Sequence, residues 1–444
     1  LTDPKAPVPS RERYFGLHFD FHASPKNCGD RTIGETLKAA DIEWICREFK
    51  PDFIQIDCKG HPGWASYPTK IGNAMPKIAG DPLKLWREVT KANGVGLYMH
   101  YSGVVDEKYL AEYPDEATKG VDGKPNGWFS TRTNGGYADR LLIPQLKELA
   151  GVYGVDGVWV DGECWGANED FDPRTVAQFE KETGIRLGGN LPDVRSEPYF
   201  NEYRDFCRTL FKRYLNHYVD AVHAEYPHFR IASNWAFTDH MPEKVSANVD
   251  FLSGDVDPDL SFSSARYAAR AIARQAMPWD LMSWSFRWSK FYTPGYNTPK
   301  RPIQLLQEAA AIISLGGGYQ NYAQQLPDGS PNLRQLRPLK VLADFLHPRK
   351  RWCFGGISAK QVGVLLSTFD RNRESAGLYH RTGCAKIKGL VDLLCDSGHS
   401  TAIVSEFNLE KDIDSWPVLV VPELFEGLEA KTAAALLGYV ERGG

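Results

Sequence analysis

The stretch VDGVWVDGECW, residues 155–165, is the clearest indication of fold in this chain. Residues 157–160 form a short apolar run of the kind that buried strands have, and the run ends in Asp161. Gly162 follows, and a residue without a side chain lets the backbone turn sharply after a strand. We therefore predict a buried strand over 157–161 that presents a carboxylate at its carboxyl end.

Similar runs recur along the first 345 residues or so, at intervals of roughly 40 residues, each followed by a segment with helical periodicity. The predicted strands cover residues 14–20, 53–57, 95–101, 157–161, 229–234, 249–254, 280–286 and 318–322, and helical patterns include 203–226, 263–275 and 304–315. Alternating strands and helices are typical of a parallel sheet, and eight such repeats favour a (β/α)₈ barrel.

The pattern changes after residue 347. Shorter strand-like and helical segments follow at 362–367, 387–394, 401–404, 418–423 and 430–442. They are typical of a smaller doubly wound α/β domain. We therefore divide the chain into a tail over 1–13, a barrel over 14–347 and a second domain over 348–444, and we expect that second domain to be incomplete because a further strand should follow residue 444.

Charge and composition exclude several classes of function. The chain has 52 basic and 56 acidic residues without a basic cluster, which disfavours a nucleic-acid partner. No apolar stretch is long enough to span a membrane, and three prolines within residues 1–9 hint at an exported, secreted or periplasmic protein. The eight cysteines lie singly, so no structural zinc site is expected, and no nucleotide-binding glycine loop predicts a cofactor.

Polar and aromatic side chains follow nearly every predicted barrel strand. They are His18, Asp20, His22, Asp57, Lys59, His61, His100, Tyr101, Asp161, Glu163, Asn234, Trp235, Asp255, Trp284, Trp288 and Asn321. In a barrel the carboxyl ends of the strands surround the active site. Aromatic faces pack against the C–H groups of a sugar while polar side chains bind its hydroxyls, so this mixture indicates a carbohydrate site.

Glycoside hydrolysis needs two carboxyl groups, about 5–5.5 Å apart in retaining enzymes and about 6.5–9.5 Å apart in inverting ones. Asp161 suits the nucleophile, because leaving a carboxylate buried at that position is unfavourable unless it is hydrogen-bonded or used in catalysis. The alternative is that Asp161 only caps the following turn.

The motifs along the barrel resemble, in order, those of the α-L-fucosidase superfamily of glycoside hydrolases, families 29 and 151. The similar segments are Phe15-Gly16 with His18 and His22, KGHPGW at 59–64, GLYMHYS at 96–102, WVDG at 159–162, Asp255 with Pro258-Asp259, PWD at 278–280 with SWS at 283–285, and 316–329. The resemblance implies a retaining exo-hydrolase that releases α-L-fucose or a related L-sugar from a glycan, with Asp161 as the nucleophile.

Departures from the family pattern leave the acid/base open. Gly60 and Pro62 stand where the family has histidine and aspartate, and Asp259 and Asp280 stand where it has glutamates. We rank the acid/base candidates as Asp255, Glu163, Asp259 and Asp280. Predicted sugar-binding residues are His18, His22, His61, Trp64, His100, Tyr101, Trp235 and Trp284, with Trp288 as a further aromatic. No metal is expected, because HExxH or a comparable spacing is absent.

The C-terminal segment resembles the amidotransferase-like domain that accompanies some family 151 fucosidases and the trimerising β-galactosidases. Such domains usually serve assembly, which suggests a homo-oligomer. Cys395 falls at a predicted helix end, a setting that does not activate a thiol. Two other functions stay open: a hydrolase for another sugar, such as an α-L-galactosidase, arabinosidase or β-galactosidase-like enzyme, and a non-catalytic carbohydrate-binding relative.

Overall fold

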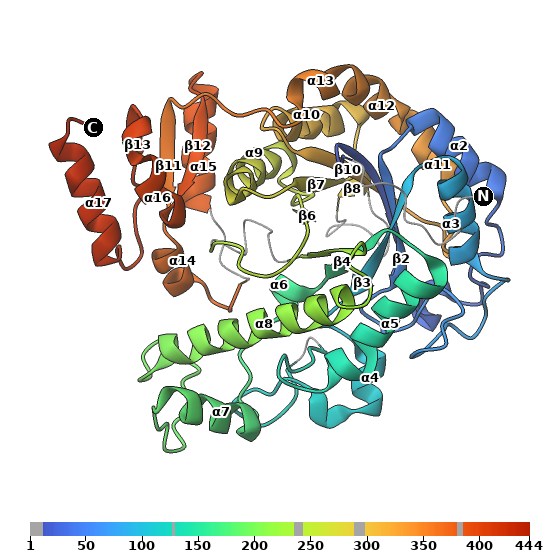
Figure 1. Ribbon diagram of the computed structural model, residues 1–444, viewed down its shortest axis with the longest axis horizontal. Helices are drawn as coiled ribbons and strands as arrows, with labels where there is room; N and C mark the ends of the chain where they lie inside the picture. Colours follow the sequence, from blue (N-terminus) through green and yellow to red (C-terminus); the bar gives the residue numbers. More distant parts are fainter. Residues whose placement is uncertain (1–11, 127–128, 235–242, 288–297, 380–384) are drawn as a thin grey trace.

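The computed structural model describes residues 12–126, 129–234, 243–287, 298–379 and 385–444 (Figure 1). Its main sheet has eight strands in the order β5-β4-β3-β2-β1-β10-β7-β6, and every hydrogen-bonded neighbour is parallel. The strands are β1 (Phe15–Asp20), β2 (Phe53–Lys59), β3 (Gly96–Ser102), β4 (Gly157–Asp161), β5 (Arg230–Ser233), β6 (Leu252–Asp255), β7 (Trp279–Trp284) and β10 (Gly318–Gln324). All eight predicted barrel strands are confirmed.

The two edge strands, β5 and β6, nearly close the barrel. The backbone N–H of Asp250, just before β6, donates to the Ile231 carbonyl at 2.8 Å. The Asp250 carboxylate in turn accepts the backbone N–H of Ile231 at 2.6 Å. These two bonds satisfy an edge that would otherwise be open, and the sheet forms the barrel predicted from the sequence.

Helices surround the barrel and bury its outer face (Figure 1). The longer ones are α2 (Ala39–Phe49), α3 (Pro82–Ala92), α8 (Phe200–His223), α9 (Ser261–Ile272) and α10 (Pro302–Ile313), with α5 (Ile143–Glu148) and α12 (Lys340–Leu346) among the shorter ones. Strands β1 to β4 are buried along their whole length, as expected for parallel strands covered on both faces. Among the described residues, no helix has the length and apolar character needed to cross a bilayer.

Arg13 closes the amino-terminal end of the barrel. Its guanidinium carbon lies 3.7 Å from the centre of the Phe53 ring and 3.8 Å from that of Phe251. Its Nε donates to the carboxylate of Asp280 at 2.7 Å. Asp280 lies near the start of β7, at the end of the barrel opposite the active-site rim, so its prediction as an acid/base candidate is wrong.

A second, smaller sheet follows the barrel, with strands β11 (Val362–Leu366), β12 (Thr401–Ser405) and β13 (Val418–Val420) parallel in the order β12-β11-β13. Helix α15 (Ala385–Asp396) and barrel helix α9 pack on one face, and α16 (Glu406–Asp412) and α17 (Ala430–Glu441) on the other. Helices on both faces confirm the predicted doubly wound arrangement. The exact domain boundary at residue 347 and the homo-oligomer stay predictions.

The smaller domain is attached to the barrel through α9 (Figure 1). Arg266 of α9 donates to Asp392 of α15 at 2.9 Å, and the Arg270 guanidinium donates to the Thr401 carbonyl at 2.8 Å. Tyr267, also on α9, packs with Val364 of β11 in one buried cluster. The barrel therefore supplies part of the core of the second domain.

Candidate active site

Asp161 ends β4 at the carboxyl rim, and three side chains hold its carboxylate. Oδ1 accepts a hydrogen bond from Asn234 Nδ2 at 2.7 Å. Oδ2 lies 3.2 Å from Nε2 of His100 and 3.2 Å from Nε2 of His61. Burial alone would raise the pKa of Asp161, but the hydrogen bonds from the two imidazoles outweigh it and hold the pKa well below its usual value. Asp161 is therefore an ionised, oriented carboxylate.

His100, on β3, is fully buried among carboxylates. Its Nδ1 lies 2.9 Å from Oδ1 of Asp57, and its Nε2 lies 3.2 Å from Asp161 and 3.6 Å from Asp20. Burial would lower the pKa of His100, yet the surrounding carboxylates, Asp20 foremost, raise it well above its ordinary value. The charged imidazole thus links the carboxyl ends of β1, β2 and β4.

His22 follows β1 and lies against His61. Its Nε2 is 3.1 Å from Oδ2 of Asp20, its Nδ1 accepts the backbone N–H of His61 at 3.2 Å, and the two imidazole centroids are 4.4 Å apart. Its φ of 47° is in the left-handed region, which disfavours a residue with a side chain. Strain of this kind persists only where the surrounding contacts fix the conformation.

Gly60 gives His22 this position. A Cβ at residue 60 would lie 2.4 Å from Nδ1 of His22, closer than such contacts occur. Position 60 is one of the two places where the chain departs from the fucosidase loop motif, which has histidine there. The space that a side chain at 60 would need is taken by the imidazole of His22 from the neighbouring strand end.

Ser102 fixes the orientation and tautomer of His61. Nδ1 of His61 lies 2.6 Å from the Ser102 hydroxyl oxygen, and that hydroxyl donates to the Val105 carbonyl at 2.6 Å. The hydroxyl has one proton and a carbonyl can only accept, so Nδ1 of His61 is the donor. Nε2 of His61 therefore attracts the Asp161 carboxylate only when the imidazole carries a second proton, on Nε2.

His18 is a neutral donor at the same rim. The Gln55 amide donates to its Nδ1 at 2.8 Å, which leaves the proton on Nε2. Burial lowers the pKa of His18, the largest of several effects on it. Its buried Nε2 lies 4.0 Å from Oδ2 of Asp20, which is too far for a hydrogen bond, and within the described part of the chain it has no hydrogen-bond partner. A buried donor of this kind is suited to bind a ligand hydroxyl.

Asp255 ends β6 and is only partly buried. The indole Nε1 of Trp284, on β7, donates to its Oδ1 at 2.8 Å. Burial and the negative charge of Asp161 raise the pKa of Asp255 to about 7, although the indole hydrogen bond opposes the shift. A carboxyl group that keeps its proton near neutral pH has the property that a general acid needs.

Glu163 lies outside this cluster. It is fully buried between the barrel and α8, where the Tyr218 hydroxyl donates to its carboxylate at 3.1 Å and Ser233 donates a second hydrogen bond. Burial raises the pKa of Glu163 to about 8. The Glu163 carboxyl group faces Tyr218 in the layer between the barrel and α8, not the interior of the rim, so the interpretation of Glu163 as a rim acid is wrong.

Tyr101 also points away from the rim. It is fully buried, and its hydroxyl donates to the Gln145 side chain of α5 at 2.6 Å. Its prediction as a sugar ligand is therefore wrong.

Trp64 is half-buried on the loop after β2, with Nζ of Lys108 5.4 Å from its ring centre. Asp259 is exposed on the turn after β6.

Two predicted aromatic residues, Trp235 and Trp288, lie outside the described residues. The structure adds one that sequence reasoning missed, Trp165, whose ring centre is 4.8 Å from that of His61. Trp165 could have been predicted from the sequence, because it follows Asp161 by four residues. Gln55 and Ser102, which fix the tautomers of His18 and His61, were also missed, because such second contacts leave no pattern in one sequence.

Among the described residues, two groups of side chains have the spacing of metal ligands, Asp20–His22–His100 and His22–His61–Asp161, each with ligand atoms within 4.8 Å. Both include His22, and the lone pair of its Nδ1 is already used. Because Nδ1 of that ring accepts a backbone N–H, Nε2 carries the proton of a neutral imidazole and offers no lone pair. The donor set as arranged therefore does not fit a metal ion.

Comparison with known proteins shows that this chain has the fold of several solved structures. No family model matches the chain, and no curated protein matches it. Among solved structures, α-L-fucosidase isoenzyme 2 from Paenibacillus thiaminolyticus is 20% identical with a TM-score of 0.78, over 97% of this chain. This chain spans 63% of the length of that fucosidase.

Two β-galactosidases have a similar fold. The enzyme from Rahnella sp. R3 is 14% identical over 93% of this chain and 67% of its own, with a TM-score of 0.66. The enzyme from Halorubrum lacusprofundi is 13% identical over 97% of this chain and 72% of its own, also with a TM-score of 0.66. By name the three proteins are one α-L-fucosidase and two β-galactosidases, and at these identities the similarity is one of fold.

Proposed function

We propose that this protein is a retaining exo-glycoside hydrolase that releases α-L-fucose or a related L-sugar from glycans. The observation that carries the proposal is the contrast between two carboxyl groups at one rim. The pKa of Asp161 is held well below its usual value, while that of Asp255 is raised to about 7. Two carboxyls with opposed environments take the roles of nucleophile and acid/base.

In the first step Asp161 attacks the anomeric carbon while Asp255 gives its proton to the leaving oxygen. The bond from the anomeric carbon to that oxygen breaks as the ester bond to Asp161 forms. Oδ2 of Asp161 already contacts two imidazoles, whereas Oδ1 accepts one hydrogen bond from the described residues, that of the Asn234 amide. Oδ1 therefore keeps the more accessible lone pair, and we assign it as the attacking atom.

In the second step Asp255, now ionised, takes a proton from water, and the resulting hydroxide oxygen attacks the anomeric carbon. The ester bond breaks and Asp161 leaves as the carboxylate. His100 stabilises the returning negative charge on Oδ2. His18 and His22 lie at the same rim, and we assign them to the sugar hydroxyls.

The choice of sugar rests on the motif resemblance, and the fold of the Paenibacillus fucosidase supports it. The two β-galactosidases of similar fold favour a second candidate, a β-galactosidase-like hydrolase. A panel of 4-nitrophenyl glycosides with α-L-fucosyl, α-L-galactosyl, α-L-arabinosyl and β-D-galactosyl groups separates them. Tight sugar binding without turnover on any of these substrates would instead favour a non-catalytic relative.

Replacing the nucleophile tests the mechanism. Asp161→Gly removes the attacking atom, so turnover should be abolished, and added azide should restore cleavage of an activated aryl glycoside by entering the vacated space. The matched control is Asp139→Gly, because Asp139 is an exposed carboxylate on the helical segment Ala138–Leu142. Full activity of the Asp161 variant would remove this residue from the mechanism.

A further inference from the structure

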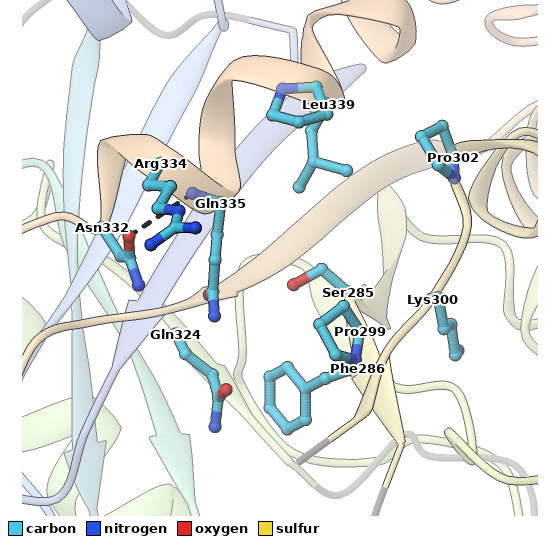
Figure 2. A pocket seen from close by; sticks show the side chains of 11 residues that line it. Ser285, Phe286, Pro299, Lys300, Pro302, Gln324, Asn332, Arg334, Gln335 and Leu339 are labelled. Atoms are coloured by element: carbon cyan, nitrogen blue, oxygen red, sulfur yellow. Dashed lines mark hydrogen bonds between the residues drawn. The ribbon is translucent and has the colours of Figure 1, made fainter. Parts of the chain in front are cut away.

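A cavity of about 440 Å³ opens beside the rim, next to the carboxyl ends of β7 and β10 (Figure 2). Its far wall is the short helix α11 (Leu333–Leu336) with the residues around it. This volume falls within the range of about 300–1,000 Å³ that small-molecule sites have. The wall residues that matter here are Ser285, Phe286, Gln324, Asn332, Arg334 and Gln335.

An unbroken row of contacts connects this cavity with Asp255. The indole of Trp284 donates to Asp255, and the ring centres of Trp284 and Phe286 are 5.3 Å apart. Phe286 is itself a wall of the cavity. The cavity therefore lies on the Asp255 side of the rim, separated from that carboxyl group by the Trp284 and Phe286 rings.

The polar side chains of the cavity are available for a ligand. In the described part of the chain, the side-chain amides of Gln324 and Gln335 make no hydrogen bond with the protein, and the Arg334 guanidinium has no ion pair. Figure 2 shows the two amides and the Phe286 ring around the same space. The other cation in the wall, Lys300, is paired with Glu308 at 2.8 Å.

These groups are suited to a sugar ring. An amide both donates and accepts, as a hydroxyl does, so each glutamine can bind one or two neighbouring hydroxyls. The Phe286 ring offers an apolar face for C–H groups. Among the described residues that line the cavity there is no carboxylate that could compete with the ligand for Arg334.

We propose that the cavity binds the sugar unit on the leaving-group side of the cleaved bond, so that the substrate is an oligosaccharide rather than a simple glycoside. This inference rests on the proposed function, because Asp255 as the acid fixes the side on which the leaving group departs. The cavity then determines the choice of glycan, while the rim cluster around Asp161 performs the cleavage.

Two substrates with the same terminal sugar test the inference in the full chain. One is 4-nitrophenyl α-L-fucoside, and the other is lactose with one α-L-fucosyl unit. Gln324→Ala and Gln335→Ala should each lower kcat/KM for the oligosaccharide about 3-fold to 10-fold, the effect of one lost hydrogen bond, and leave the aryl glycoside unchanged. The matched control is Gln307→Ala, on an exposed position of α10 outside the cavity, which should change neither substrate.

Equal losses on both substrates, or no loss on either, would overturn the inference. If the wild-type protein cleaves no glycoside of the panel, the proposed function fails. Calorimetric titration with lactose then tests sugar binding in the cavity independently of catalysis. Lactose binding that both glutamine variants weaken would support a sugar site there. An absence of lactose binding by the wild-type protein would overturn it.

Discussion

The indole of Trp284 should control the pH dependence of the reaction through Asp255. Asp255 must be protonated in the first step, and burial and the charge of Asp161 raise its pKa to about 7. The activity, as kcat/KM, is therefore expected to fall as the pH rises through about 7. Below that pH it should stay level over several units, because the pKa of Asp161 is well below its usual value.

Trp284→Phe keeps an aromatic ring but removes the hydrogen bond to Asp255, which is 2.8 Å long. That bond stabilises the ionised carboxylate, so its loss favours the protonated form and raises the pKa. A hydrogen bond to a charged group contributes about 1.5 kcal/mol, and one pKa unit corresponds to about 1.4 kcal/mol. The upper limit of the pH profile should therefore move from about 7 to about 8.

The assay measures kcat/KM for an aryl glycoside between about pH 4 and pH 10. The quantity to compare is the upper apparent pKa of this profile in the wild-type protein and in Trp284→Phe. The matched control is Trp352→Phe, because Trp352 is 73% exposed and lies on α13 (Lys350–Cys353), away from the rim. An upper limit that stays in place, or that moves to lower pH in Trp284→Phe, would refute the role given to Asp255 as the acid. A shift in the control would point to a general effect on the protein instead.

Four further substitutions test the residues at the rim and the neighbouring Glu163. Asp57→Asn removes a carboxylate from His100 and should lower the pKa of that imidazole, with a loss of about 10-fold to 100-fold in kcat/KM; an NMR titration of His100 checks the cause. Gly60→Ala places a Cβ 2.7 Å from the Cα of His22 as well as against its ring, so it should weaken sugar binding by calorimetry and also lower the melting temperature. Glu163→Gln replaces a group that is already protonated near neutral pH, so activity within about 2-fold of wild type is expected, whereas Asp255→Asn should lose nearly all of it.

The positions of the barrel strands could be predicted because parallel strands covered on both faces are continuous apolar runs. The side chains at their ends were harder to place. His100 and Tyr101 are neighbours on β3, and successive residues of a strand point to opposite faces, so one of the two had to point outward. The sequence alone does not say which, and burial of His100 among carboxylates decides it.

Asp161 and Glu163 show a second limit. The sequence analysis placed both at the rim because both come at the carboxyl end of the fourth predicted strand, two residues apart. The strand ends at Asp161, however, and Gly162 follows with a φ of 80°. The turn carries Glu163 into the layer between barrel and helix, where Tyr218 binds it. A change of direction by one glycine is enough to separate two carboxyls with different roles.

Because Arg13 closes the amino-terminal end of the barrel, it affects how the chain folds while it is being synthesised. Arg13 and Asp280 are 267 positions apart, so one of them emerges from the ribosome long before the other. Until β7 has been synthesised, Arg13 lacks the Asp280 carboxylate as its counter-ion. The aromatic rings around Arg13 are then exposed to water at the amino-terminal end of the barrel. The base of the cylinder is therefore completed late, and a nascent chain interrupted before β7 would expose an apolar opening to chaperones and to other unfinished chains.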